Sequence, residues 1–328
     1  MARIFFSVAV LSMLSVLPVA AQNAISSGTI AGCVRDPSGR VVPGAAVSVT
    51  SNDTGLRHED TTNSGGLYNF PIMSVGGYTV RVWHDHFKTT EVRNVIVQVG
   101  QTATVNVQLA IGPLSQQLVV EAAAPVFRPG ESSVTTVLPR EFVEELPLSG
   151  RRYTDFVLLA PNVAADGDSG QISIGGQQGS SDSGYHNGNG ANSFTVDGAN
   201  ATSSFFGDAR GGTNVPYLFG EQSIQEFQVA VTPSSAAYGG AATGFINTVT
   251  KSGGDVLHGD AFYYLRHSAT GANDAVDKAN GIPKPLNVLQ QFGADLGGAL
   301  IRRKLWFYFD YEQQFPPVKD IGKYPTYE

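Results

Sequence analysis

The sequence has little charge and a single cysteine. Charged residues make up 15% of its 328 positions, the formal net charge is −7, and Cys33 is the one cysteine. An acidic chain without long basic runs offers no surface for a phosphate backbone, so we expect no nucleic acid partner. A lone cysteine excludes a disulfide within the chain. Glycine, in contrast, occurs 38 times, which favours turn-rich β structure over helical bundles.

Motifs of catalytic, nucleotide and metal sites are also missing. The sequence has no His-Glu-x-x-His, no Gly-x-Ser-x-Gly and no P-loop. His84 and His86 would share one strand face but lack a third ligand. Asp166-x-Asp168-x-Gly170 lacks the length and the final glutamate of a calcium loop. We therefore predict that the protein is not an enzyme, with no catalytic residues, no cofactor and no bound metal.

The N-terminus predicts export. An apolar run, Ile4–Leu17, is short for a membrane span and is followed by the small residues Val19–Ala21. Residues 1–21 are therefore predicted to be a signal peptide. Cys33 ends a segment that resembles a lipobox, but polar residues separate it from the apolar run. We expect Cys33 to be a small buried residue on the first strand instead.

Residues 22–111 predict an antiparallel β-sandwich. Short alternating segments follow each other at the spacing typical of sandwiches, and turn signals such as Asp36-Pro37-Ser38-Gly39 separate them. The expected strands are Thr29–Arg35, Ala45–Ser51, Leu67–Pro71, Tyr78–His84, Val92–Val99 and Ala103–Leu109. Trp83 and Phe87 are expected to close one end of the sandwich rather than bind sugar, because buried aromatic residues usually serve packing.

The motifs of this region resemble the carboxypeptidase regulatory-like domain. They are Gly32-x-Val34-x-Asp36-x-x-Gly39, Val42-Pro43-Gly44-Ala45, Gly65-x-x-Tyr68-x-Phe70 and Gly77-Tyr78-Thr79-Val80. The resemblance implies a seven-stranded, transthyretin-like sandwich that is not itself a peptidase. The same fold is grouped with carbohydrate-binding-like folds, although no residue here marks a sugar site.

Residues 130–254 mix helical and extended patterns. The expected elements are a strand at Ser133–Val137, helices at Arg140–Leu146 and Arg152–Leu159, a polar loop over Ala164–Asn192 with a short strand at Gln171–Gly175, and strands at Ser193–Val196, Ser223–Val231 and Phe245–Lys251. Asp197-Gly198 is a turn signal. On pattern alone, Phe245–Lys251 and the alternating segment Val256–Arg266 would form a hairpin around Ser252-Gly253-Gly254.

An ordered series of motifs in this region resembles the plug domain of TonB-dependent outer-membrane receptors of the Oar-like branch. In chain order the motifs are Pro147-Leu148-Ser149-Gly150-Arg151, Asp197-Gly198, Ile224-Gln225-Glu226-Phe227, Tyr238-Gly239 and Asn247-Thr248-Val249-Thr250-Lys251-Ser252-Gly253. In that family the last motif closes the plug and the next strand is the first of the barrel. The resemblance therefore implies a domain boundary near residue 254 rather than a hairpin.

Residues 255–328 predict the first strands of an outer-membrane barrel. Val256–Arg266, Gln291–Leu300 and Leu305–Glu312 alternate apolar and polar residues with the dyad repeat of such strands. A polar loop, Ser268–Val288, and a charged turn, Arg302–Lys304, connect them. Since the smallest barrels need about eight strands, we expect the sequence to be the N-terminal part of a longer receptor.

Residues 112–129 predict a linker that contains one unpaired strand. The segment Leu118-Val119-Val120-Glu121-Ala122 resembles the TonB box, which in this family adds as an edge strand to the periplasmic C-terminal domain of TonB. An exposed apolar strand tends to pair with another strand, so its presence suggests such a partner. The segment could equally be the last strand of the sandwich or a plain spacer.

The resemblance implies a mainly β protein: a sandwich, an α+β plug and an incomplete barrel. Its expected function is energy-coupled uptake or export of a large or scarce ligand, with the plug gating the barrel. The expected partners are the C-terminal domain of TonB, the outer membrane and an unidentified extracellular ligand such as a glycan or a peptide. The alternative is a secreted or surface carbohydrate-binding or adhesive β-protein, in which Val256–Glu312 packs as a soluble sheet.

Overall fold

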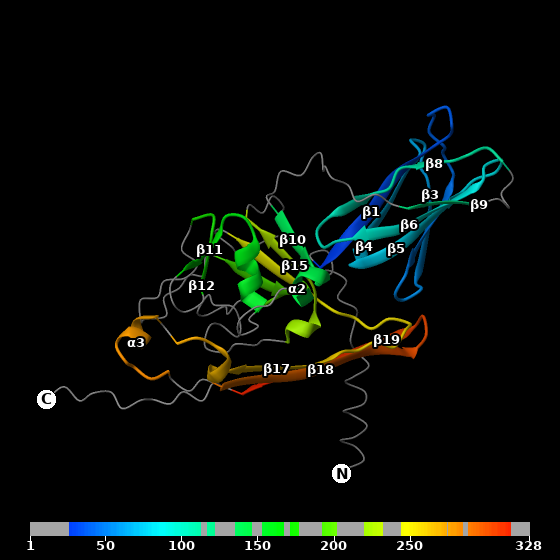
Figure 1. Cartoon of the computed structure of the whole chain (residues 1–328). Helices are drawn as coiled ribbons and strands as arrows, with labels where there is room; N and C mark the ends of the chain where they lie inside the picture. Colours follow the sequence, from blue (N-terminus) through cyan, green and yellow to red (C-terminus); the bar gives the residue numbers. More distant parts are fainter. Residues whose placement is uncertain are drawn as a thin grey trace, which may run out of the picture.

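The computed structural model describes residues 26–112, 117–121, 135–145, 153–166, 171–176, 192–201, 220–231, 244–273, 275–284 and 288–315. Strands dominate this part of the chain, which confirms the predicted mainly β fold class. Figure 1 shows a sandwich, a middle sheet with short helices beside it, and a long three-stranded sheet below both. None of the helices in these ranges has the length and apolar character needed to cross a membrane.

The sandwich consists of a four-stranded and a five-stranded sheet. In the first, β1 (Ser27–Arg35) pairs with β4 (Leu67–Ser74), β7 (Thr102–Thr104) and β8 (Val107–Gln108). In the second, the order is β3 (Arg57–Thr61), β2 (Ala46–Ser51), β5 (Gly76–Trp83), β6 (Thr89–Val97) and β9 (Gln117–Glu121).

The alternating pattern places one apolar core between these two sheets. Its fully buried residues include Ile30, Val34, Val47, Val49, Val80 and Val82. The hydroxyl of Tyr68 donates to the Val105 carbonyl oxygen at 2.6 Å, so this buried ring also satisfies its polar end. Burial raises the pKa of Tyr68. Phe87 packs against the core, and Trp83 is half-buried with the Arg57 guanidinium carbon 5.7 Å from its ring centre.

Two strands of the sandwich differ from the prediction. β3 was not expected, because all five of its residues are exposed and its sequence, Arg-His-Glu-Asp-Thr, has no apolar alternation. β3 is a strand only because its backbone pairs with that of β2. The segment Gln117–Glu121 was predicted to be unpaired, and this prediction is wrong: it pairs in parallel with β6. Without β9, the backbone groups on that edge of β6 would lack a strand partner.

The middle sheet has five strands and a small companion sheet. Its order is β10 (Thr135–Pro139), β15 (Ile224–Ala230), β16 (Phe245–Thr250), β13 (Ser193–Val196) and β14 (Ala199–Asn200). Beside it lie α2 (Arg140–Glu145), the 3-10 helices η1 (Tyr153–Leu159) and η2 (Glu221–Ser223), and the pair β11 (Val163–Asp166) and β12 (Gln171–Ile174).

A second core holds this region together. It contains the fully buried residues Phe156, Phe227, Ile174, Ile224 and Ile246. The helix predicted at Arg152–Leu159 is a 3-10 helix here, and β11 lies at the start of what was expected to be a polar loop. The turn predicted at Asp197-Gly198 joins β13 to β14, with φ of 50° and 79°. Both angles are positive, as a type I′ hairpin requires.

The three-stranded sheet consists of β17 (Ala261–His267), β18 (Val288–Ile301) and β19 (Leu305–Phe315). The hairpin suggested by pattern around Ser252–Gly254 does not form, because β16 pairs with β15 and β13 whereas β17 pairs with β18. β17 begins at residue 261 rather than 256; before it, His258 makes an isolated bridge with Gly297. The loop after β17 contains η3 (Ser268–Thr270) and α3 (Ala275–Ala279).

Candidate functional site

The two faces of the three-stranded sheet have opposite character. Cross-strand neighbours Leu296 and Phe309 share one face, and Asp295 and Asp310 share the other. Apolar residues on the sheet are exposed: Tyr263 59%, Leu265 56%, Leu296 43%, Leu300 65%, Leu305 49%, Phe309 62%, Tyr311 51% and Phe315 50%. Gln291 and Asp295, in contrast, are buried. The arrangement is the reverse of a water-soluble sheet, which buries its apolar face.

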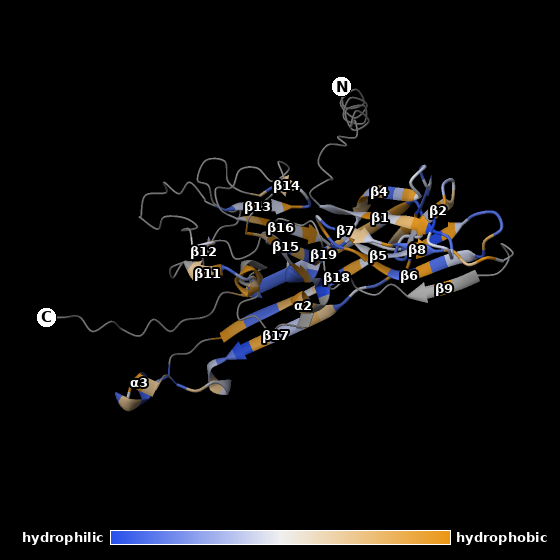
Figure 2. Cartoon of the chain, turned by 90° about the horizontal axis from the view of Figure 1, so that it is seen from above, coloured by the Kyte–Doolittle hydropathy of each residue, from blue (hydrophilic) through white to orange (hydrophobic). Residues whose placement is uncertain are grey.

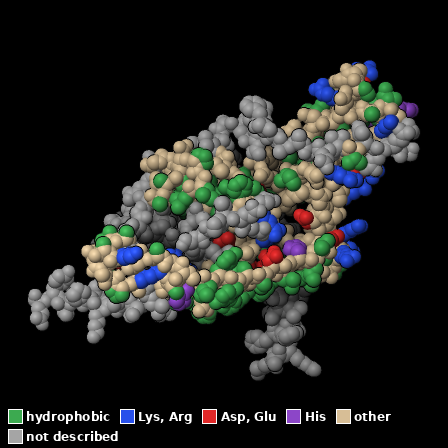
Figure 3. Space-filling model, in the orientation of Figure 1, with side chains coloured by type: hydrophobic (Ala, Val, Ile, Leu, Met, Phe, Trp, Pro, Cys, Tyr) green, Lys and Arg blue, Asp and Glu red, His purple; other side chains and the backbone are tan. Residues whose placement is uncertain are grey.

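Figures 2 and 3 show how the apolar residues of this sheet are distributed. Apolar and polar segments alternate along these strands in Figure 2. Figure 3 shows hydrophobic side chains gathered along the lower edge of the molecule, where Figure 1 draws β17–β19. An apolar outer face suits contact with lipid, as on the outside of an outer-membrane barrel.

The buried polar face is joined to the middle sheet by an ion pair. Nζ of Lys251, just after β16, lies 3.7 Å from Oδ2 of Asp295, and the two side chains are only 2% and 3% exposed. The other carboxylate oxygen of Asp295 accepts the backbone N–H of Asp260 at 2.7 Å. The Tyr308 hydroxyl lies 2.9 Å from Asp295 Oδ2 and 3.0 Å from the Gln222 carbonyl oxygen, so it can donate either to β18 of its own sheet or to η2, which precedes β15.

The end of β16 brings together most of the predicted plug-motif residues. The Asp197 carboxylate accepts the backbone N–H of Thr250 at 2.8 Å and its hydroxyl at 2.6 Å. Asn247 is fully buried and its Oδ1 accepts the Thr195 hydroxyl at 2.7 Å. Gly198 completes the turn that positions Asp197. Tyr238 and Gly239, and the motif at Pro147–Arg151, lie outside the described residues.

The segment Ser252–Gly254 passes very close to the three-stranded sheet. A Cβ built on Gly253 would lie 2.1 Å from the Phe307 carbonyl oxygen and 2.7 Å from that of Gly298, so only glycine fits there. Asp255 follows, and its Oδ1 accepts the backbone N–H of Arg303 and the indole N–H of Trp306, both at 2.9 Å. These two hydrogen bonds, the backbone one first, lower the pKa of Asp255.

The sandwich contacts the same junction through buried polar groups. Oε2 of Glu226, a residue that is only 2% exposed, accepts the backbone N–H of Val99 at 2.9 Å. The Gln228 side-chain amide lies 3.4 Å from the Val99 carbonyl oxygen. The backbone N–H of Asp255 donates to the Asp53 carbonyl oxygen at 2.7 Å. All three parts of the fold therefore meet around β15 and the end of β16.

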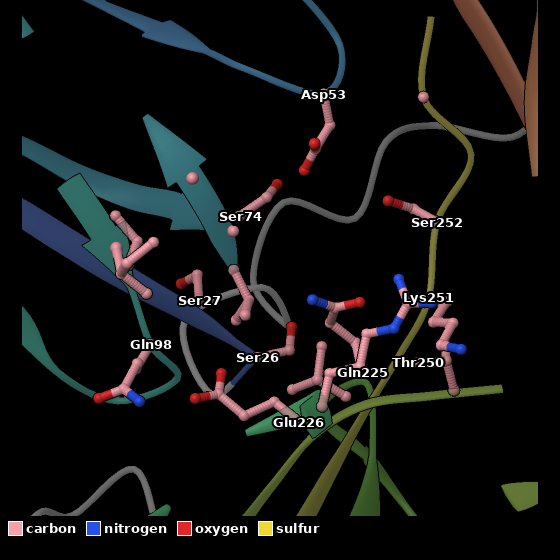
Figure 4. A pocket seen from close by; sticks show the side chains of 18 of the residues that line it. Ser26, Ser27, Asp53, Ser74, Gln98, Gln225, Glu226, Thr250, Lys251 and Ser252 are labelled. Atoms are coloured by element: carbon pink, nitrogen blue, oxygen red, sulfur yellow. The ribbon is translucent and has the colours of Figure 1, made fainter. Parts of the chain in front are cut away.

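A cavity of about 690 Å³ lies at this junction. Its lining comes from the sandwich, the middle sheet and the segment that follows β16 (Figure 4), and it includes Ser27, Asp53, Gln98, Glu226, Thr250 and Lys251. Figure 4 shows Gln98 and Ser27 on the sandwich side, with Thr250 and Lys251 across the cavity from them. We call this region the three-sheet junction.

The TonB-box-like residues lie away from this junction. Leu118, Val119, Val120 and Glu121 belong to β9, and Val119 is 46% exposed. Ala122 lies outside the described residues. The register pairs Thr89 with Gln117 and continues to Arg93 with Glu121. Figure 1 shows β9 at the sandwich end that is remote from the middle sheet. In the structure this segment is therefore the last strand of the sandwich, which is one of the two alternatives to an unpaired TonB box that the sequence left open.

The described part of the chain contains no cluster of three or more His, Cys, Asp or Glu side chains that could hold a metal ion. Cys33 lies on β1 as a partly buried thiol. Sequence reasoning missed Asp295, Tyr308 and Gln228 as junction residues. Asp295 could have been found, because it is an acid on the polar side of an alternating strand rich in glycine.

Two segments of the chain match known families. Residues 29–110 match the carboxypeptidase regulatory-like domain, and residues 249–316 match an outer membrane beta barrel domain. Over 303 residues the chain is 26% identical to the TonB-dependent transporter Oar of Myxococcus xanthus, in an alignment that covers 88% of this chain and 27% of that protein. The chain thus spans about a quarter of the length of that relative.

Solved structures with similarity to the chain include two receptors. The siderophore receptor PirA of Acinetobacter baumannii is 21% identical, with a TM-score of 0.39, over 55% of this chain and 24% of that chain. A mutant of the ferric enterobactin receptor PfeA of Pseudomonas aeruginosa is 17% identical, with a TM-score of 0.41, over 55% and 24%. The barrel-domain match and the transporter relative confirm the resemblance stated from the motifs and the predicted outer-membrane location.

Proposed function

Because this chain joins a carboxypeptidase regulatory-like domain to an outer-membrane barrel segment and is related to TonB-dependent transporters, we propose that it supplies three parts of such a receptor. In this proposal the sandwich lies in the periplasm, the middle sheet is the plug, and β17–β19 are the first strands of the barrel wall. The corresponding domains are the predicted ranges 22–111, 130–254 and 255–328, with residues 112–129 as the connection.

The observation that carries the proposal is the reversed character of the three-stranded sheet. A wall strand of a barrel faces lipid on one side and the plug on the other, so its apolar residues are exposed and its polar residues are covered by the plug. Leu296 and Phe309 lie on the exposed face, whereas Asp295 is covered by Lys251 of the middle sheet. A soluble adhesive sheet would leave the polar face in water instead.

The proposed activity is energy-coupled transport of a large or scarce ligand. The ligand would bind at the extracellular side of plug and barrel, and TonB would pull on the segment Leu118–Ala122 to remodel the plug. The three-sheet junction would then connect the plug to the barrel wall. Lys251 and Asp295 would form the buried contact between them, and the Asp197 carboxylate would hold the end of β16 by accepting a hydrogen bond from Thr250. The transporter relative supports a role without catalysis.

A labelling experiment tests the membrane-facing surface. Leu296 and Leu56 are matched leucines, 43% and 42% exposed, the first on β18 and the second in a turn of the sandwich. Each is replaced by cysteine in a Cys33→Ser background, labelled with an environment-sensitive fluorophore and studied in the full chain in detergent micelles. We expect a brominated detergent to quench the label at position 296 strongly and the label at position 56 weakly, and iodide to do the opposite.

The outcome separates the two candidate functions. Because Leu296 and Leu56 are almost equally exposed, a difference in quenching between the two labels cannot arise from accessibility alone. If iodide quenches both labels equally and the brominated detergent quenches neither, the sheet faces water. That result would contradict the receptor proposal and favour the alternative, a secreted or surface binding protein.

A further inference from the structure

A basic turn lies at one end of the exposed apolar face of the three-stranded sheet. Arg302, Arg303 and Lys304 join β18 to β19, and all three are exposed. The apolar residues directly beside them are exposed as well: Leu300 65%, Ile301 55% and Leu305 49%. Figure 3 shows Lys and Arg side chains at the right-hand end of the lower hydrophobic edge, where Figure 1 draws this turn. A cationic turn therefore borders the surface that faces lipid in the proposed function.

The segment after the middle sheet holds the shape of this turn. The backbone N–H of Lys304 donates to the Ile301 carbonyl oxygen at 3.0 Å, and Arg303 has a positive φ of 59°. Residues other than glycine rarely adopt such a φ, so the surrounding structure must stabilise it. Asp255 does so, because its Oδ1 accepts the backbone N–H of Arg303 at 2.9 Å. The three cations are thus carried on a turn of defined conformation.

Two of the three positive charges have no ion-pair partner in the described part of the chain. Nε of Arg303 and Oδ2 of Asp255 both lie beside Gly55, at 3.4 Å and 3.5 Å from a Cβ built there, so Asp255 offsets the charge of Arg303. Within the described ranges, no Asp or Glu side chain forms an ion pair with Arg302 or Lys304. These two cations can therefore bind an anionic ligand.

The position of the turn matches the headgroup layer of a membrane. A bilayer has a hydrocarbon core of about 30 Å, with a headgroup layer of about 5–7 Å on each side. One strand residue advances about 3.3 Å. Arg302 and Lys304 are each the sequence neighbour of an exposed apolar residue, so their charges reach the headgroup layer when the apolar face lies in the core. Short turns of outer-membrane barrels lie on the periplasmic side, whereas longer loops are extracellular.

We propose that this turn binds the phosphate group of an anionic phospholipid in the periplasmic leaflet of the outer membrane. Arg302 and Lys304 donate hydrogen bonds to the phosphate oxygens, and the guanidinium of Arg302 can do so with two parallel N–H groups. A zwitterionic lipid carries an amine that cancels the charge of its phosphate, so the turn favours a lipid with a net negative charge. The inference rests on the proposed function, because it requires the three-stranded sheet to face lipid.

Lipid selectivity near the turn tests the inference. Leu300→Cys in a Cys33→Ser background carries a fluorophore two positions from Arg302, in the full chain in maltoside micelles. Brominated phosphatidylglycerol and brominated phosphatidylcholine are added in separate titrations, and the quenching of the label gives their relative affinity. We expect the label to be quenched at a lower concentration of phosphatidylglycerol than of phosphatidylcholine.

Removal of the two cations should abolish this preference. A basic residue near an anionic membrane surface favours association about fivefold, so Arg302→Gln with Lys304→Gln should reduce the preference for phosphatidylglycerol by about tenfold or more. Arg303 is kept, because it forms the turn and is offset by Asp255. Arg81→Gln with Arg93→Gln removes two exposed cations of the sandwich and is the matched control, which should retain the preference.

The outcomes separate this inference from the proposed function. Equal affinity for the two lipids, or an unchanged preference in the variant of Arg302 and Lys304, would overturn the inference. If both lipids quench the label without selectivity, the sheet still faces lipid, so the proposed function stands and the inference alone fails. If neither lipid quenches the label, both fail.

A salt series with the unaltered turn distinguishes a lipid headgroup from free phosphate. Sodium chloride and sodium phosphate at equal ionic strength should weaken the preference to the same extent, because both screen the charges. A greater loss in phosphate would show that the turn binds the free ion and would contradict the assignment to a lipid. A preference that neither salt weakens would contradict the role of the cations, even if the variant of Arg302 and Lys304 does not fold.

Discussion

The ion pair between Lys251 and Asp295 provides the sharpest test of how the middle sheet holds β18. Asp295→Asn keeps the size of the side chain and removes its charge. Both partners are almost fully buried, at 2% and 3% exposure. Removal of one partner from a buried pair typically costs about 3–5 kcal/mol. Since the 3.7 Å separation is longer than a charge-assisted hydrogen bond, we expect a cost near the lower limit, about 3 kcal/mol.

The cost can be read from urea unfolding of the full chain in detergent micelles. The chain has two tryptophans, and Trp306 lies at the junction, so a Trp83→Phe background makes fluorescence report on that region. With a slope of about 2 kcal/mol per molar urea, a loss of about 3 kcal/mol lowers the midpoint by about 1.5 M. Asp85→Asn, an exposed aspartate with the same charge change, should leave the midpoint unchanged.

A double-mutant cycle then isolates the pair itself. Lys251→Met combined with Asp295→Asn should cost less than the sum of the two single variants, by about 1 kcal/mol or more, because the second change removes a charge that no longer takes part in this ion pair. Additive costs, together with a midpoint shift below about 0.5 M for Asp295→Asn, would refute the role assigned to this ion pair.

Two further predictions concern a close approach and a titration. Gly253→Ala should destabilise the chain by about 1–3 kcal/mol in the same urea assay, because its methyl group would meet two carbonyl oxygens. Gly271→Ala, whose Cβ meets only Lys284 Nζ at 3.7 Å, should be neutral, and equal midpoints for the two variants would contradict this reasoning. Hydrogen bonds from the Ser38 hydroxyl and then the Arg40 backbone lower the pKa of Asp36 from 3.8 to about 2. Its stabilising contribution is therefore complete above the unfolded value and is lost as the pH falls through about 2. Ser38→Ala should move the pKa, followed by NMR of the carboxyl carbon, back toward 3.8; an unmoved pKa would show that the hydroxyl is not the cause.

The sandwich strands with apolar alternation could be predicted from sequence, whereas those defined by pairing alone could not. Val47 and Val49 alternate with polar residues, and the core position of β2 follows from that pattern. β3 has no such pattern, because both of its faces are exposed and only its backbone pairs with β2. The position of β9 depends on a free edge of β6, a property of the folded sheet that no local pattern records.

At the three-sheet junction, too, some residues could be predicted from sequence motifs and their partners could not. Asp197, Thr250 and Lys251 were expected from motifs, and the structure brings all three to the end of β16. Their partners belong to other elements: Lys251 meets Asp295, which follows it by more than forty positions in the sequence. A contact of that separation depends on how the sheets pack and not on spacing along the chain. The hairpin that pattern alone suggests around Ser252–Gly254, and that the motif resemblance argues against, does not form for the same reason, since each strand pairs with another element.

The hydrogen bond from the Val99 backbone to Glu226 bears on how the molecule unfolds. A buried carboxylate that loses such a donor is less well stabilised, so opening the sandwich at Val99 also destabilises β15. The sandwich and the middle sheet should therefore exchange their amide hydrogens as one cooperative unit in this region, although their sequences resemble separate domains. A cut in the chain near residue 111 would divide the sequence without dividing that unit.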